Sequence, residues 1–302
     1  MNKSFHSNGK LLITAEYVVL DGATALAIPT TFGQSLEIAT SSLEGLHWQS
    51  IDNTGEVWYE DFFEVKSFES ENPSNIYSKT LSKILLEAKR LNPNFLSEAY
   101  GIKARTKLDF PRNWGLGTSS TLINNISQWA KVDAFTLLNK SFGGSGYDIA
   151  AAQNDSPVLY KLNKSLPIVQ PINLSWNFTT SIFFVYLNEK QDSKQGIAHY
   201  RKHPIHKQKI NQISDITRML FQCQSISEFE TLLNLHEQII SEILKLPTIK
   251  EQHFPDYPKT IKSLGAWGGD FVLVTGSDLD MEYFRNKGFA TILPFENMIY
   301  QK

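Results

Sequence analysis

The feature that most constrains this chain is a glycine-punctuated stretch, residues 111–121, that leads directly into a helical pattern. Gly115 and Gly117 permit backbone conformations that are closed to residues with a Cβ atom. Hydroxyl-bearing side chains follow at residues 118–121, at the start of the helix, where unpaired N–H groups attract anions. The stretch therefore predicts a phosphate-binding loop that rests on a packed helix.

Two further glycine-rich stretches adjoin regular elements. Residues 143–148 open a short helical pattern and end in Asp148, which either caps that helix or orients a substrate hydroxyl. Residues 263–270 precede an apolar strand. None of the stretches carries the Gly-Lys-Ser/Thr of a Walker A loop or the three glycines of a dinucleotide fingerprint. Three in one chain indicate a functional site more strongly than any one of them.

Length and composition narrow the architecture and the partners. A chain of 302 residues with 41% hydrophobic residues favours two domains, and the proline-containing connection at 163–177 places the boundary near residue 165. The formal net charge is −2 without long charge runs, so neither nucleic acid nor a membrane is expected as a partner. The single cysteine, Cys223, fits a reducing, cytoplasmic setting.

Hydrophobic periodicity predicts the other elements. Helices are expected at 78–91, 210–220, 229–244 and 280–287, and strands at 10–20, 25–29, 102–108, 158–162, 181–187, 271–274 and 291–294, with hairpins between 35 and 65 and a polar loop after residue 187.

Several polar residues allow two interpretations. Lys10 and Glu16 interrupt an apolar run, where a strand-edge lysine and a solvated glutamate are the structural alternatives to functional groups. Alternation places Lys103, Arg105 and Lys107 on one face of a strand, which is either the wet side of a sheet or a phosphate-binding face. His236 lies on a helical apolar face and is expected to be packed rather than catalytic.

Three segments in the expected order resemble the motifs of the GHMP kinases, the superfamily of galactokinase, homoserine kinase, mevalonate kinase and phosphomevalonate kinase. Residues 9–22 resemble the first motif, residues 115–120 the ATP-phosphate motif and residues 265–270 the third, so the resemblance spans nearly the whole chain. It implies an α+β fold with two domains: a ribosomal-protein-S5-like ATP-binding domain at 1–165 and a ferredoxin-like domain at 166–302. The active site is then expected in the cleft between them.

The resemblance also implies ATP and Mg²⁺ as cofactors. Lys10 matches the lysine that lowers the pKa of the attacking group, Asp148 the carboxylate that accepts or orients its proton, and Ser119 the hydroxyl that approaches the metal. The ATP phosphates are expected on Gly115, Leu116, Gly117, Thr118, Ser119 and Ser120. Substrate contacts are expected from Glu16, Ser145, Gly146, Lys194, Arg201, Gly268, Gly269 and Asp270.

Two details favour phosphomevalonate kinases within the superfamily. The third motif ends in Asp270 where mevalonate kinases usually have a glycine, and residues 144–150 resemble the Gly-Ser-Gly-x-Asp-Ile/Val-Ala of phosphomevalonate kinases. A phosphorylated, acidic small molecule would also suit the basic residues. Leu137 stands where mevalonate kinases carry a metal-binding glutamate, and Trp267 replaces a usual glycine.

We therefore expect an ATP-dependent kinase of an acidic metabolite, with phosphomevalonate of isoprenoid precursor synthesis as the favoured acceptor. The alternatives are mevalonate kinase or another GHMP kinase, a diphosphomevalonate decarboxylase, which the motif forms favour less, and a non-catalytic relative that binds nucleotide or a metabolite. The oligomeric state stays open, with a homodimer as one alternative.

Overall fold

A computed structural model describes residues 2–191, 193–203 and 206–300. The chain forms two compact units, each assembled from separated segments. Unit 1 contains the described residues of Met1–Gly9, Phe32–Arg112 and Leu116–Gln153, and unit 2 those of Lys10–Thr31, Asn113–Gly115 and Asn154–Lys302. The α+β class is confirmed, whereas the contiguous domains expected at 1–165 and 166–302 stay a prediction.

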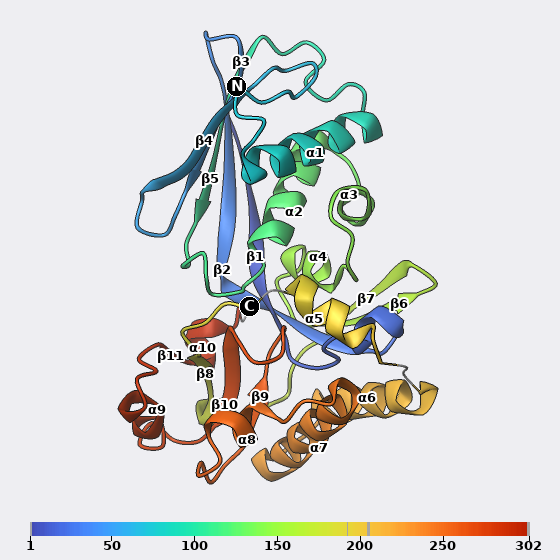
Figure 1. The fold of residues 1–302 in the computed structure, drawn as a ribbon, viewed down its shortest axis with the longest axis vertical. Helices are drawn as coiled ribbons and strands as arrows, with labels where there is room; N and C mark the ends of the chain where they lie inside the picture. Colours follow the sequence, from blue (N-terminus) through green and yellow to red (C-terminus); the bar gives the residue numbers. More distant parts are fainter. Residues whose placement is uncertain (1, 192, 204–205, 301–302) are drawn as a thin grey trace. The chain divides into compact units, whose positions relative to one another are not determined.

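Unit 1 is a twisted sheet with helices on one face (Figure 1). Its strands include β3 (Gly45–Ile51), β4 (Val57–Phe63) and β5 (Gly101–Leu108), together with parts of β1 (Lys3–Leu12) and β2 (Ala25–Thr40). β5 runs parallel to β3 and antiparallel to β2. The helices of this unit are α1 (Ile76–Leu91), α2 (Thr118–Ala130), α3 (Ala134–Ser141) and α4 (Tyr147–Ala152).

Apolar periodicity explains how unit 1 is packed. The expected helix at 78–91 is confirmed as α1, whose buried face carries Leu81, Ile84 and Leu85. On β5 the side chains alternate as predicted, so that Lys103, Arg105 and Lys107 share the more exposed face. The Arg105 guanidinium donates from Nε to Gln49 Oε1 at 3.3 Å, a contact within the sheet surface.

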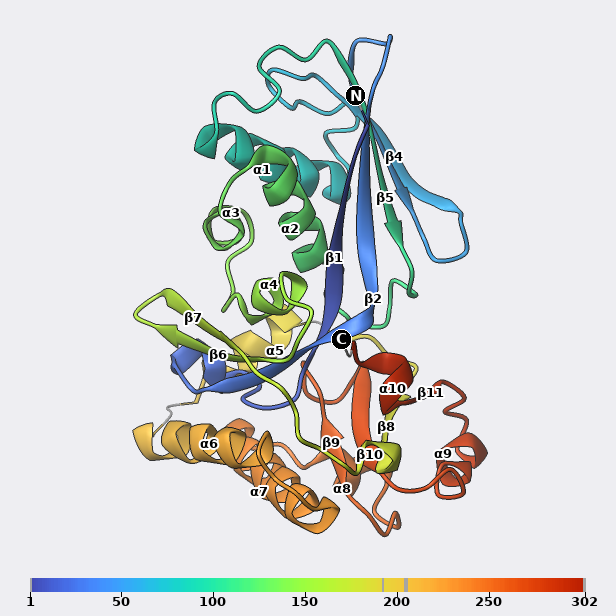
Figure 2. The same ribbon diagram turned by 180° about the vertical axis from the view of Figure 1, so that it is seen from behind.

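Unit 2 contains an antiparallel sheet in the order β11-β8-β10-β9 and a helical pair beside it (Figure 2). The first residues of β2 also pair here with β6, which pairs in turn with β7. The strands of unit 2 are β6 (Val158–Asn163), β7 (Leu166–Pro171), β8 (Ile182–Tyr186), β9 (Ile261–Ser263), β10 (Phe271–Thr275) and β11 (Ile292–Pro294). The helices are η1 (Val18–Asp21), η2 (Thr179–Ser181), α5 (Ser193–Tyr200), α6 (Lys207–Leu220), α7 (Ile226–Leu244), α8 (Ile249–His253), α9 (Glu282–Asn286) and α10 (Phe295–Met298).

The strand expected at 10–20 is wrong beyond Leu12. The chain turns instead, with positive φ angles of 70° at Ala15 and 60° at Tyr17, and continues as the short helix η1. The Ala15 N–H donates to the His236 side chain instead of to a neighbouring strand. This backbone group therefore has a hydrogen-bond partner without any further strand pairing.

Two expected connections contain regular structure. Residues 163–177 include β7, and Pro167 and Pro171 fit it because β7 is the edge strand of its sheet. The polar loop expected after residue 187 contains α5, which buries Tyr200 at its end. Asp192, which belongs to the same expected loop, lies outside the described residues.

None of the described helices combines the length and the apolar character needed to cross a bilayer. The cysteine thiol of Cys223 is buried and donates to the Leu220 carbonyl at 3.0 Å.

Candidate functional site

The lysine of the first motif meets the glycine of the second. Lys10 extends from β1, and its Nζ donates to the Gly115 carbonyl oxygen at 2.8 Å. Gly115 has a φ of 68°, a conformation that favours glycine. The preceding residues are anchored in the same unit, because Tyr186 donates its hydroxyl to the Asn113 carbonyl at 3.1 Å and Trp114 packs edge-on against Phe271. A cation is thereby fixed beside the glycine stretch.

Asp270 approaches the same glycine from the third motif. Its carboxyl group occupies the space that a Cβ atom at position 115 would need, so a larger residue there would displace it. Asp270 Oδ1 accepts a hydrogen bond from the Gln191 N–H at 3.4 Å. Burial raises the pKa of this carboxyl group, while the Lys10 ammonium opposes the shift. Lys10, Gly115 and Asp270 therefore form one cluster within unit 2, in which a cation and a carboxyl group lie beside the same glycine.

The rest of the second motif starts α2 in unit 1. Gly117, with a φ of 93°, is the N-cap of this helix and has no side chain to accept from the first-turn N–H groups. Ser120 turns its hydroxyl back to the Gly117 carbonyl at 2.7 Å. Leu116 is buried, whereas Ser119 is exposed in the first turn. An uncapped helix start after a glycine-rich loop suits an anion such as the phosphates of ATP.

Asp148 lies in the first turn of α4, behind the N-cap Gly146 with its φ of 87°. The carboxylate is half-buried, and Oδ1 accepts from the Ile149 N–H at 3.0 Å. This contact agrees with the structural interpretation of Asp148 as a helix-start acid. Ser145 precedes it and is also half-buried.

A complete protein cage for Mg²⁺ is not found among the described residues, which contain no group of three or more His, Cys, Asp or Glu side chains arranged to hold a metal. Leu137, at the position matched to a metal-binding glutamate, is fully buried in the core of unit 1. The exposed Ser119 hydroxyl and a nucleotide's phosphates suit Mg²⁺, which keeps several waters and needs few protein ligands.

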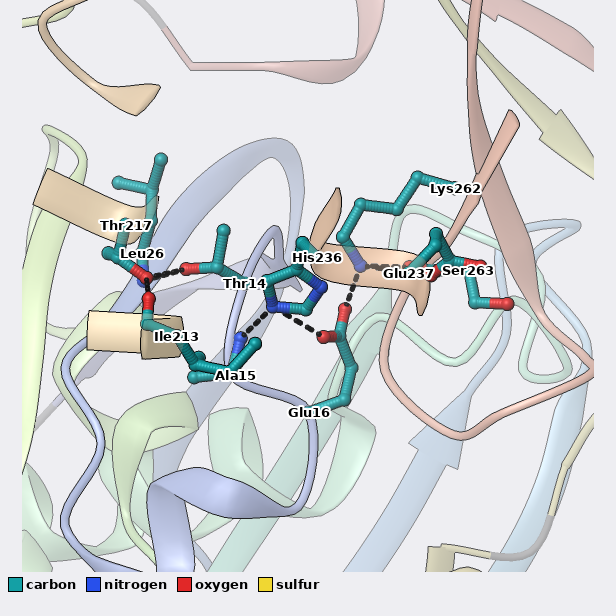
Figure 3. Close-up of polar contacts among 10 residues, drawn as sticks. All are labelled: Thr14, Ala15, Glu16, Leu26, Ile213, Thr217, His236, Glu237, Lys262 and Ser263. Carbon is teal, nitrogen blue, oxygen red and sulfur yellow. Dashed lines mark hydrogen bonds and ion pairs between the residues drawn. The ribbon is translucent and has the colours of Figure 1, made fainter. Parts of the chain in front are cut away.

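Glu16 is not a solvated glutamate, since its side chain is fully buried. Its Oε1 accepts from the Lys262 ammonium at 2.6 Å (Figure 3). Its assignment to substrate binding stays a prediction. His236 is packed as expected, and its Nε2 accepts from the Ala15 N–H at 2.8 Å. Glu237, which follows on α7, has its Oε1 3.4 Å from the same ammonium nitrogen.

The expected basic substrate contacts differ in their surroundings. Arg201 Nη1 donates to both carboxylate oxygens of Asp21, at 2.9 and 3.0 Å. Lys194 is exposed near the start of α5. In the third motif, Gly268 has a φ of 91°, and Gly269 lies so close to the Gln191 side chain that a Cβ atom would collide with it. These glycines are therefore needed for the shape of the stretch.

Sequence reasoning missed the residues that connect the motifs. Lys262 precedes the third stretch, and Tyr17 follows Glu16, with its hydroxyl accepting from the Trp267 N–H at 2.8 Å. The only signal for Lys262 was a single cation next to an apolar residue, which is also typical of an edge position.

Comparison with known proteins shows the fold. No family model and no curated protein matches the sequence. Among solved structures, the Methanococcus jannaschii mevalonate kinase is similar over 100% of this chain and 99% of its own, with a TM-score of 0.69 and 14% identity. The Streptococcus pneumoniae phosphomevalonate kinase in complex with phosphomevalonate and AMPPNP matches over 96% and 99%, with a TM-score of 0.68 and 14% identity. The Lactococcus lactis galactokinase complexed with galactose matches over 94% and 88%, with a TM-score of 0.68 and 12% identity.

The chain therefore has the fold of these kinases along its whole length. The three kinases act on different compounds according to their names, so their common fold does not select an acceptor.

Proposed function

We propose that this protein is a GHMP-type small-molecule kinase that transfers the γ-phosphoryl group of ATP to an acidic metabolite, with phosphomevalonate as the favoured acceptor. The observation that carries the proposal is the bond from Lys10 to the Gly115 carbonyl, which holds a cation beside the glycine stretch in a chain with the kinase fold. Phosphoryl transfer depends mainly on positioning and on neutralising charge, and this arrangement suits both needs.

Each group at the site has a proposed task. Residues 115–120 and the uncapped start of α2 bind the phosphates of ATP, and Ser119 contributes a hydroxyl toward Mg²⁺, which would neutralise phosphate charge when bound. Lys10 stabilises negative charge that develops on the attacking oxygen. Asp148 accepts or orients the proton of the attacking group.

Ser145, Gly146, the third motif and α5 are each proposed to contribute contacts to the acceptor. An acidic compound is favoured because Lys194 supplies an exposed cation on α5. Arg201 binds both oxygens of Asp21, so it would have to share or release that carboxylate to contact the acceptor. Phosphomevalonate is favoured over mevalonate by Asp270 and the Gly-Ser-Gly stretch, and the pneumococcal enzyme of the same fold was crystallised with phosphomevalonate.

The decisive experiment is a coupled ADP-release screen of the purified protein over mevalonate, phosphomevalonate, homoserine and sugars. The proposal expects the highest kcat/KM with phosphomevalonate. A higher value with another acceptor would reassign the substrate within the kinases. A folded protein that binds ATP without turning over any acceptor would favour a non-catalytic relative.

Asp148→Asn is the sharpest single variant for the catalytic assignment. We expect kcat to fall by about 100- to 10,000-fold, with ATP affinity largely kept, because the amide cannot take the proton. Asp278→Asn, which changes an exposed aspartate outside the proposed site, is the matched control and should leave kcat unchanged. Turnover of Asp148→Asn close to that of the control would remove Asp148 from the mechanism.

A further inference from the structure

A buried ammonium group joins two of the motifs within unit 2. Lys262 on β9 is fully buried, and its Nζ donates to Glu16 Oε1 at 2.6 Å and to the Ser263 carbonyl at 2.8 Å (Figure 3). Glu237 Oε1 lies 3.4 Å from the same nitrogen. The three protons of the ammonium group thus have three acceptors, as a buried cation requires.

The carboxylate partner belongs to a strained turn. Ala15 and Tyr17, on either side of Glu16, both have positive φ angles, which are unfavourable for residues with a Cβ atom. The Ala15 N–H is satisfied by His236 Nε2 at 2.8 Å, and burial lowers the pKa of this imidazole, which favours its neutral form. Such a turn persists only where its surroundings hold it.

A second link connects the same turn to the third motif. The Tyr17 hydroxyl accepts from the Trp267 N–H at 2.8 Å, and its ring stacks on Tyr200 with centroids 5.6 Å apart. Gly196 on α5 leaves room for the hydroxyl, since a Cβ atom there would lie 2.5 Å from it. Residues 15–17 are therefore fastened to residues 262–267 at two points.

These two links lie between the groups that surround Gly115. Upstream of the turn, β1 carries Lys10, which binds the Gly115 carbonyl. Downstream of Trp267, Asp270 packs its carboxyl group against the same glycine. Any relative shift of the two segments would therefore change the separation of the Lys10 cation and the Asp270 carboxylate.

We propose that Lys262 is a positioning residue: its ion pair with Glu16, together with the Tyr17–Trp267 hydrogen bond, holds the 15–17 turn against the third motif and so fixes Lys10 and Asp270 around Gly115. The kinetic part of this inference rests on the proposed kinase function. A buried ion pair suits this role because it requires a specific geometry, whereas two apolar side chains of similar size would pack without one.

The test distinguishes a role of Lys262 in stability from a role in positioning Lys10 and Asp270. Lys262→Met leaves the Glu16 carboxylate buried and unpaired, so it should lower the melting temperature strongly. Glu16→Met/Lys262→Met removes both charges of the ion pair and should regain most of that loss below pH 7, where burial keeps Glu237 protonated and neutral. Lys259→Met, on an exposed lysine of the same segment, is the matched control.

For the double variant we expect kcat to stay about 10- to 100-fold below that of the unmodified protein, with the KM for ATP within about threefold. We also expect faster amide hydrogen exchange across residues 263–270 than in Lys259→Met. A double variant that regains both its melting temperature and its kcat would overturn the proposal, since the cluster would then serve stability alone.

Tyr17→Phe provides a variant that should fold, because it removes one hydroxyl and keeps the ring. The Trp267 amide should exchange faster in this variant, and kcat should fall by about threefold or more. Unchanged exchange at Trp267 would contradict the second link. Hydrogen exchange needs no substrate, so it tests the two links even if no kinase activity is found. Altered exchange with an unaltered kcat would contradict the positioning role while leaving the links in place.

Discussion

Lys259 and Lys262 lie in the same short segment of unit 2 and make ion pairs of opposite kinds. Lys259 Nζ lies 2.9 Å from Asp280 Oδ2, and the two side chains are 42% and 27% exposed. Lys262 Nζ lies 2.6 Å from Glu16 Oε1, and both side chains are 0% exposed. Water screens the first pair and can replace either partner, whereas the second pair is shielded from solvent. Solvent access, more than separation, therefore decides how much an ion pair contributes to stability.

The largest expected difference between the two pairs is in stability. Lys262→Met should lower the free energy of unfolding by about 3–5 kcal/mol, because it leaves a carboxylate buried without its cation. Urea denaturation followed by circular dichroism measures this loss, with Lys259→Met as the control. Equal losses in the two variants would show that the Lys262 environment is wetter than the structure indicates.

Glu237 should make the stability contributed by the buried cluster depend on pH between about 4.5 and 8, a range in which the exposed pair does not titrate. Burial raises the pKa of Glu237 from its usual 4.5 to about 8, although Lys262 opposes the shift. Between these values the folded protein keeps a proton that the unfolded chain releases, so the contribution of Glu237 to stability falls as the pH rises from about 4.5 to 8.

Glu237→Gln should therefore flatten the decline of the melting temperature between pH 6 and pH 8, since the amide does not titrate. Thermal unfolding at several pH values measures this slope. Parallel curves for the variant and the unmodified protein would mean that Glu237 titrates normally.

The exposed pair should give the smallest effects, and they should come from Asp280 more than from Lys259. The Asp280 carboxylate also accepts from the Ser277 N–H at 2.7 Å, and the hydrogen bond from this N–H is the main reason that the pKa of Asp280 falls from 3.8 to about 2. Asp280→Asn should cost about 0.5–1 kcal/mol and Lys259→Met less.

The contribution of Asp280 is fully present above about pH 4 and is lost as the pH falls toward 2. Chemical denaturation at pH 7 and pH 3 should therefore show the gap between Asp280→Asn and the unmodified protein narrowing at the lower pH. A stability difference that widens at pH 3 would show that the pKa of Asp280 is raised by folding instead of lowered.

Sequence patterns predicted the elements with a regular period and the glycine stretches. The helices α1, α6 and α7 were expected because their apolar residues repeat with a helical period. The glycines of the second motif were informative because Gly115 and Gly117 do adopt positive φ angles. These features depend on residues that are close together in the sequence.

The turn at Ala15 and Tyr17 could not be predicted, since neither residue type favours a positive φ. What holds it comes from far along the chain: Lys262 lies 246 residues after Glu16. The same reason hid the burial of Glu16, because only a distant ammonium makes a buried carboxylate acceptable. The site assignments beyond these contacts remain predictions for the kinetic variants to test.

Residues Lys10–Thr31 belong to unit 2, so the ribosome makes them long before most of the unit that they pack into. Thr24 binds Ser214, 190 residues later, and Thr14 binds Thr217, 203 residues later. At about 5–20 residues per second, these early residues wait roughly 10–40 s for the helix that covers them. During this time the apolar residues of segment 10–31 are exposed and can form non-native contacts. Slowed translation or added chaperone should therefore change the yield of folded protein more than its final stability.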